Sequence, residues 1–145
     1  MTKTIPLFEL KKVQSDFMQK TIQSTKESQE YIRQFYLDDI NVFESAFILL
    51  LNSANITIGY AKISQGGITG TVVDPRLVAK YAVESLAVGV ILAHNHPSGN
   101  LKPSTPDKVL TDKVKEGLKY LDIKLLDHII LTNDGYYSMM EEGDL

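Results

Sequence analysis

The sequence lacks cysteine, an excess of basic residues and any long hydrophobic run. The absence of cysteine excludes disulfide bonds, thiolate nucleophiles and thiolate metal sites, so any metal ion must be held by histidine and carboxylate ligands. The 15 Lys and Arg residues are outnumbered by 18 Asp and Glu residues, and the formal net charge is -3. This charge has the wrong sign for a protein that depends on non-specific phosphate contacts, so we expect no direct nucleic-acid binding by this domain alone.

The hydrophobic pattern also excludes a membrane protein. The longest apolar run, residues 87–93, is far too short to cross a bilayer, and the first 17 residues lack an apolar core of signal-peptide length. These features predict a soluble, cytoplasmic protein.

The length and composition indicate one globular domain. With 145 residues, of which 43% are hydrophobic, the chain is of ordinary size for a single core. Residues 1–24 are polar and too few to build a core, so we expect an N-terminal arm or an extra helix. Residues 25–145 then form the domain.

Periodicity along residues 25–145 predicts alternating helices and strands. The Asp74-Pro75 pair is a helix-start signal, with an N-cap acceptor followed by proline at the first helical position. The near-continuous apolar run at 88–93 is typical of a strand that is buried on both faces. The expected helices are 25 to about 40, 74–86 and about 106–121; the expected strands are 47–51, 56–60, 68–73, 88–93, 123–131 and 136–138, with a turn at 52–55 and a loop at 94–106. The pattern predicts an α/β domain in which a mixed central sheet packs against helices.

The candidate metal-binding residues follow the buried strand directly, in the segment His94-Asn95-His96. In an extended backbone, residues two apart point to the same side, so both imidazoles can face one point. Ten residues separate His96 from Asp107, and the intervening loop can bring that aspartate back to the histidines. Two imidazoles and one carboxylate leave a fourth tetrahedral position open, as in catalytic zinc sites. We therefore predict a divalent metal site, preferably for zinc, at His94, His96 and Asp107.

These residues also have structural interpretations. The histidines could be hydrogen-bonded loop residues without a metal. The S-x-x-D spacing of Ser104 and Asp107, just before an apolar run, is a variant of the capping box and could serve only the helix start.

The combined motifs resemble a known family. His94-Asn95-His96-Pro97, followed by S104-x-x-D107 and preceded by a glutamate about fifty residues earlier, is similar to the JAMM metalloprotease motif of the JAB/MPN domain. The stretches ESAFILLLN from Glu44, DPR from Asp74, HNHPSG, PSTPD and LLDHIIL resemble the RadC family, also called UPF0758, from about residue 25 to the end. This resemblance implies a JAB/MPN, cytidine-deaminase-like fold and a RadC-like metallohydrolase domain at 25–145.

The resemblance also implies roles for individual residues. His94, His96 and Asp107 would bind zinc, Glu44 would act as the general base, and Ser104 would donate a hydrogen bond to the developing oxyanion. Taken alone, Glu44 would be interpreted as a solvated loop carboxylate. Asp127 and His128 are neighbours in a strand and must point to opposite faces, so at most one of them can approach the site; His128 is a candidate supporting residue behind the metal ligands.

Three functions remain open at this point. The first is a zinc-dependent metallopeptidase that cleaves a peptide or isopeptide bond in a protein or peptide of unknown identity. The second is a non-catalytic accessory or binding module in DNA repair or recombination, although the helix-hairpin-helix region that longer RadC proteins carry does not fit into residues 1–24. The third is metal-dependent hydrolysis of another substrate class. The sequence does not indicate an oligomeric state.

Overall fold

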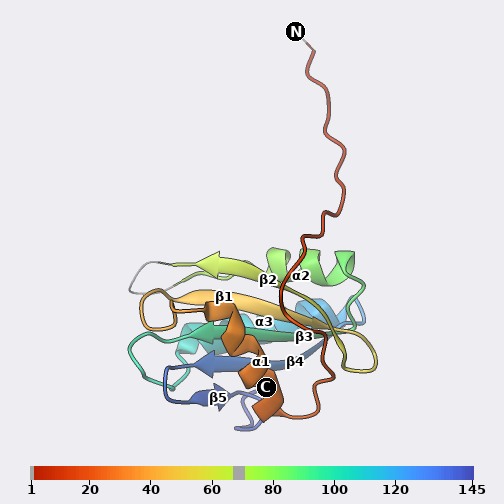
Figure 1. Cartoon of the computed structure of the whole chain (residues 1–145). Helices are drawn as coiled ribbons and strands as arrows, with labels where there is room; N and C mark the ends of the chain where they lie inside the picture. The colour runs from red at the N-terminus through yellow and green to blue at the C-terminus, as the bar shows by residue number, and fades with distance from the viewer. Residues whose placement is uncertain (1, 67–70) are drawn as a thin grey trace.

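A single mixed sheet organises the domain. The computed structural model describes residues 2–66 and 71–145. In that part of the chain, five strands form a sheet in the order β2-β1-β3-β4-β5 (Figure 1). β3 and β4 are parallel, and the other neighbouring pairs are antiparallel. The strands are β1 (Ser45–Leu51), β2 (Thr57–Gln65), β3 (Gly89–Asn95), β4 (Lys124–Leu131) and β5 (Tyr136–Ser138).

Helices cover both faces of this sheet. α2 (Pro75–Glu84) and α3 (Thr105–Lys119) pack on one face, while α1 (Thr25–Arg33) and the 3₁₀-helix η1 (Gln34–Tyr36) pack on the other. β1 and β3 are buried along their whole length because they lie between the two helical layers. The expected α/β class, with a mixed sheet packed against helices, is confirmed.

Two local signals in the sequence are realised as expected. Asp74 is the N-cap of α2, and its side chain accepts a hydrogen bond from Arg76 N at 2.9 Å. The turn between β1 and β2 is held by Asn52, whose side-chain oxygen accepts from the amides of Ala54 and Ile56, while Asn55 takes a left-handed φ of 58°. Asparagine tolerates that conformation better than most residues, which explains the asparagine-rich turn.

Several predicted boundaries differ from the structure. The strand expected at 56–60 runs from Thr57 to Gln65 as β2. The helix expected to reach residue 40 ends at Arg33 and continues only as η1, because Leu37 turns to a φ of 51° and interrupts the helical hydrogen bonds. Of the strand expected at 68–73, residues 68–70 lie outside the described residues and 71–73 form no strand. β3 extends through His94 and Asn95, which we had assigned to the loop.

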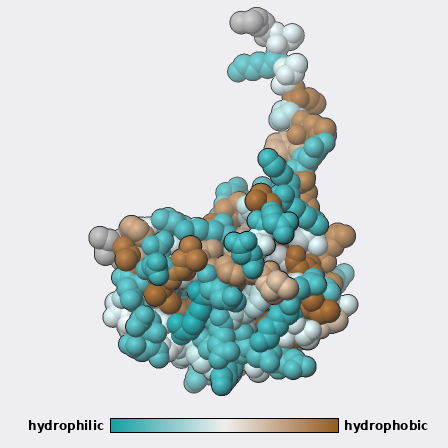
Figure 2. Space-filling model, in the orientation of Figure 1, coloured by the Kyte–Doolittle hydropathy of each residue, from teal (hydrophilic) through white to brown (hydrophobic). Residues whose placement is uncertain are grey.

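Residues 2–20 form an extended arm without a helix (Figure 1). Its distal part projects from the body, and brown, hydrophobic residues are visible along it in Figure 2. Ile5, Leu7 and Phe8 are all more than four-fifths exposed. Its proximal part is anchored, because Phe17 packs against the rings of Phe35 and Tyr60, with both centroid distances at 5.4 Å. No helix in the described part of the chain is long and apolar enough to cross a membrane.

Candidate metal centre

Two histidine side chains converge at the carboxyl end of β3. His94 lies in the strand, and the backbone of His96 continues the pairing with β4 through a bond from His96 N to Leu131 O at 2.8 Å. The extended backbone therefore places both rings on the same side of the sheet. Their Nε2 atoms lie 2.9 Å apart, as the two-residue spacing predicts.

Two carboxylates reach this pair from different elements. Asp107, in the first turn of α3, places its Oδ1 3.4 Å from His94 Nε2 and its Oδ2 3.6 Å from His96 Nε2. Glu44 immediately precedes β1, whose Ala46 is the register partner of His94, and its Oε1 lies 3.9 Å from His94 Nε2. Ligand atoms of Glu44, His94 and His96 all lie within 4.8 Å of one another, so this group could hold a metal ion.

The polar surroundings of Asp107 keep its carboxylate ionised. Burial raises the pKa of Asp107, but the contacts with the His94 and His96 rings and the hydrogen bond from Ser104 N outweigh burial and leave that pKa well below its usual value. The Asp107 carboxylate also raises the pKa of His96, against the opposing effect of burial. The carboxylate thus stays ionised in a partly buried site, where it is a strong ligand for a cation.

Ser104 and Asp107 form a complete capping box at the start of α3. The Ser104 side chain accepts from Asp107 N at 3.1 Å, and Asp107 Oδ2 accepts from Ser104 N at 2.8 Å. The structural interpretation of S-x-x-D is therefore correct. It does not compete with metal binding, because the same cap fixes the Asp107 carboxylate facing the histidines.

Comparison with protein families identifies the domain. A family model described as RadC-like JAB domain matches residues 22–144. The chain belongs to this family. The resemblance found from the HNHPSG and PSTPD segments is confirmed.

Named relatives support the same assignment. The chain is 51% identical over 100 residues to a UPF0758 protein of Flavobacterium johnsoniae, covering 69% of this chain and 44% of that protein. It is 36% identical over 141 residues to a UPF0758 protein of Pelodictyon phaeoclathratiforme, covering 96% of this chain and 63% of that protein. This RadC-like JAB domain therefore spans about half of the length of the relatives that it matches.

Asp127 and His128 of the RadC-like domain point to opposite faces of β4, as expected. His128 faces the metal centre, with its Nε2 2.7 Å from His94 Nδ1. Asp127 lies on the other face and accepts hydrogen bonds from the Ser138 hydroxyl at 2.6 Å and from Met140 N at 3.0 Å. Of these two residues, only His128 contacts the candidate metal-binding cluster.

Sequence reasoning missed two residues that support the site. The first is Asn95, whose fully buried side chain binds the segment that carries Glu44. The second is Thr111, one helical turn after Asp107, whose hydroxyl lies 2.6 Å from His128 Nδ1. The i, i+4 spacing of Asp107 and Thr111 in the predicted helix was the available signal for Thr111.

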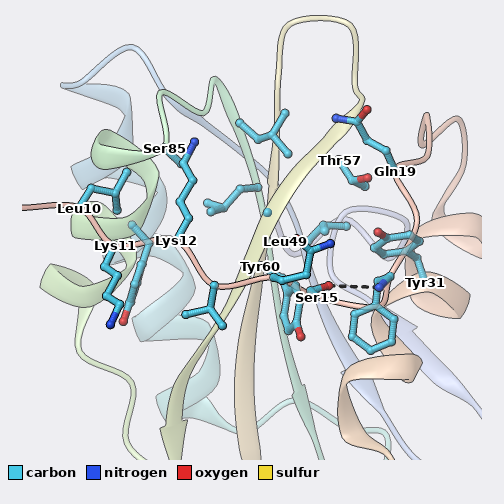
Figure 3. Close-up of a pocket in the computed structure, with 17 residues that line it drawn as sticks. Leu10, Lys11, Lys12, Ser15, Gln19, Tyr31, Leu49, Thr57, Tyr60 and Ser85 are labelled. Atoms are coloured by element: carbon cyan, nitrogen blue, oxygen red, sulfur yellow. Dashed lines mark hydrogen bonds between the residues drawn. The ribbon is translucent and has the colours of Figure 1, made fainter.

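A separate groove of about 460 Å³ lies between the arm and β2 of the RadC-like domain (Figure 3). It is lined by Lys12, Leu49 and Tyr60, among others, and by none of the residues of the metal centre. Leu49 pairs with Ile91 near the start of β3, whereas His94 lies near its end. The groove is therefore separate from the candidate metal centre.

Proposed function

We propose that this domain is a zinc-dependent hydrolase that cleaves a peptide or isopeptide bond. The observation that supports the proposal is the approach of two imidazole nitrogens to 2.9 Å with carboxylates beside them. Imidazole and carboxylate donors, without thiolates, form the ligand sets of catalytic zinc sites.

The hydrogen bond of His96 supports the fit of a cation. His96 Nδ1 lies 2.6 Å from Asn100 O, and a carbonyl oxygen can only accept, so Nδ1 carries the ring proton. In the neutral ring, the lone pair of Nε2 then points at His94 Nε2 and the Asp107 carboxylate. A cation would stabilise this arrangement of donors. In our proposal, His94, His96 and Asp107 hold the ion, because the two contacts of Asp107 are shorter than that of Glu44.

When bound, zinc would supply Lewis-acid chemistry by polarising a carbonyl and lowering the pKa of water. Glu44 would act as the general base, a role supported by the 3.9 Å distance between its Oε1 and His94 Nε2. Its carboxylate would take a proton from the attacking water and deliver it to the leaving amine. The water oxygen forms the new bond to the carbonyl carbon, the C–N bond breaks, and the products are a carboxylic acid and an amine.

Ser104 would assist the charge that develops on the carbonyl oxygen. Its Oγ accepts from Asp107 N, so its own proton remains available to donate. A positioned donor of this kind stabilises an oxyanion more than the neutral substrate. The capping box thus orients both Asp107, the proposed third ligand, and the Ser104 hydroxyl, the proposed donor.

The proposal is tested first by metal content and then by hydrolysis. Plasma mass spectrometry on untagged protein should find about one zinc per chain, and none in His96→Ala. A library of peptides and lysine isopeptides is then screened with the wild type, Glu44→Gln and the control Glu30→Gln, an exposed residue of α1. Glu44→Gln should keep zinc and lose about 10²–10⁴-fold in rate, while Glu30→Gln should match the wild type. Zinc-loaded wild-type protein that cleaves no member of the library, or an undiminished Glu44→Gln, would contradict the proposal.

A further inference from the structure

A chain of buried hydrogen bonds runs from helix α3 to the metal centre. It begins at the main-chain carbonyl of Asp107, which accepts from the Thr111 hydroxyl at 2.7 Å. The Thr111 side chain is buried, with 1% of the residue exposed. A hydroxyl has one proton. Whether Thr111 donates it to this carbonyl alone or shares it with Met139 Sδ at 3.3 Å, the hydroxyl must act as an acceptor toward its third partner.

That partner is His128. Its Nδ1 lies 2.6 Å from Thr111 Oγ1 and therefore carries a proton. The residue is 1% exposed, and among the described residues no carboxylate contacts either of its ring nitrogens. A buried ring with no carboxylate beside it is neutral. A neutral ring with a proton on Nδ1 has a lone pair on Nε2.

The lone pair of His128 Nε2 faces His94 Nδ1 at 2.7 Å, so His94 Nδ1 must donate the proton. His94 Nε2 is then unprotonated and points toward His96 Nε2 and Asp107. Every hydrogen-bond direction in the chain follows from the one before it. The result is that both histidines present unprotonated Nε2 atoms to the same point.

We propose that Thr111 and His128 are positioning residues that hold His94 in the tautomer whose Nε2 can bind the metal ion. The inference rests on the metal site of the proposed function. Thr111 is anchored on the main-chain carbonyl of Asp107, the proposed third ligand. One turn of α3 therefore orients two ligands: Asp107 through its own side chain, and His94 through the Asp107 carbonyl, Thr111 and His128. Such partners behind the ligands raise ligand basicity and fix the orientation of the ring.

The first test reads the tautomer directly and needs no variant. The chain has three histidines, so the imidazole ¹⁵N–¹H spectrum of untagged, metal-free protein contains three ring systems. At mildly alkaline pH, His94 and His128 should each carry the proton on Nδ1. A proton on His94 Nε2, or rapid exchange between the two tautomers, would overturn the proposal.

The second test compares Thr111→Val with Thr111→Ser. Valine keeps the shape of threonine but removes the hydroxyl, whereas serine keeps the hydroxyl. Chelator competition should show zinc affinity reduced about tenfold to a hundredfold in Thr111→Val and within about threefold of the wild type in Thr111→Ser. The His94 tautomer should be mixed in Thr111→Val alone.

A purely structural role would give a different result. Thr111→Val would then lower the unfolding temperature while zinc affinity and tautomer stayed at wild-type values, and the proposal would fail. The readouts are binding and tautomer rather than hydrolysis. A domain that binds zinc through the predicted tautomer but cleaves nothing would contradict the proposed function and support the positioning role.

Discussion

The side-chain oxygen of Asn95 accepts a hydrogen bond from the backbone amide of Ser45 at 2.8 Å, across fifty residues of sequence. Asn95 lies between the two metal-centre histidines, but the alternation of β3 directs it to the opposite side. Its amide nitrogen donates to the carbonyls of Ile40 and Phe43, both at 2.8 Å. The middle residue of the His-Asn-His segment thus fixes the backbone that presents Glu44.

Replacing Asn95 with alanine should destabilise the domain and misplace Glu44. The substitution leaves one amide and two carbonyls without their partner in a buried site. We expect the free energy of unfolding to fall by about 3 kcal/mol, measured by urea denaturation. Hydrolysis should fall more than zinc affinity, because the damaged segment carries the proposed base rather than the ligands.

Asn133→Ala is the matched control for this experiment. Asn133 is exposed, and its contact with this segment is a long surface hydrogen bond from Asn41 Nδ2 at 3.4 Å, so its truncation should change stability by less than about 0.5 kcal/mol. Equal stability of the two variants would show that Asn95 does not hold the Glu44 segment.

Asp107→Asn should weaken zinc binding much more than Asp112→Asn does. Both substitutions remove one negative charge from α3, but Asp112 is exposed whereas Asp107 lies 3.4 Å from His94 Nε2. We expect at least roughly a hundredfold loss of affinity for Asp107→Asn, because a direct ligand contributes more than the supporting partners that cost ten- to a hundredfold. Isothermal titration measures the affinity, and equal affinities in the two variants would remove Asp107 from the ligand set.

Most of the fold follows from local patterns in the sequence. The apolar run of β3, the Asp74-Pro75 start of α2 and the Ser104 cap of α3 each depend on residues close in the chain. The end of α1 could not be predicted in the same way. It depends on the left-handed backbone of Leu37, which no residue type in that segment requires.

Spacing alone predicts the candidate site only where its residues are close in sequence, whereas Glu44 is expected from the family resemblance. His94 and His96 share one strand face, and Ser104 and Asp107 share one helix turn, so spacing alone places each pair. Glu44 and Asn95 are brought together by strand pairing, and Thr111 meets His128 through the packing of α3 on β4. Such long-range contacts leave no periodic signal in a single sequence.

Zinc should raise the unfolding temperature of the wild type but not of His96→Ala. An ion that binds the folded state alone stabilises it by about 2.7 kcal/mol at a free concentration one hundred times its Kd. For a domain of this size, we expect an increase of roughly 5–10 °C in differential scanning fluorimetry, reversed by a chelator. A wild type that melts at the same temperature with zinc and with chelator would argue against a metal site.

Replacing Asp127 with asparagine should change how stability depends on pH. Burial raises the pKa of Asp127, against the hydrogen bonds from Ser138, Met140 and His128. Since the pKa is higher in the folded than in the unfolded state, this carboxyl favours folding fully below its unfolded pKa of about 3.9, and that contribution is lost as pH rises through the folded pKa.

Asparagine does not titrate, and its oxygen can still accept from the amides of His128 and Met140, while its amino group faces the Ser138 hydroxyl. Urea denaturation across acidic to neutral pH should therefore show the wild type losing stability relative to Asp127→Asn as pH rises. Asp112→Asn, which removes an exposed carboxylate, is the control for the loss of one negative charge. A stability difference that stays constant would mean that the three hydrogen bonds balance the effect of burial. A difference that moves in favour of the wild type toward neutral pH would mean that they outweigh it, and either result would contradict the raised pKa of Asp127.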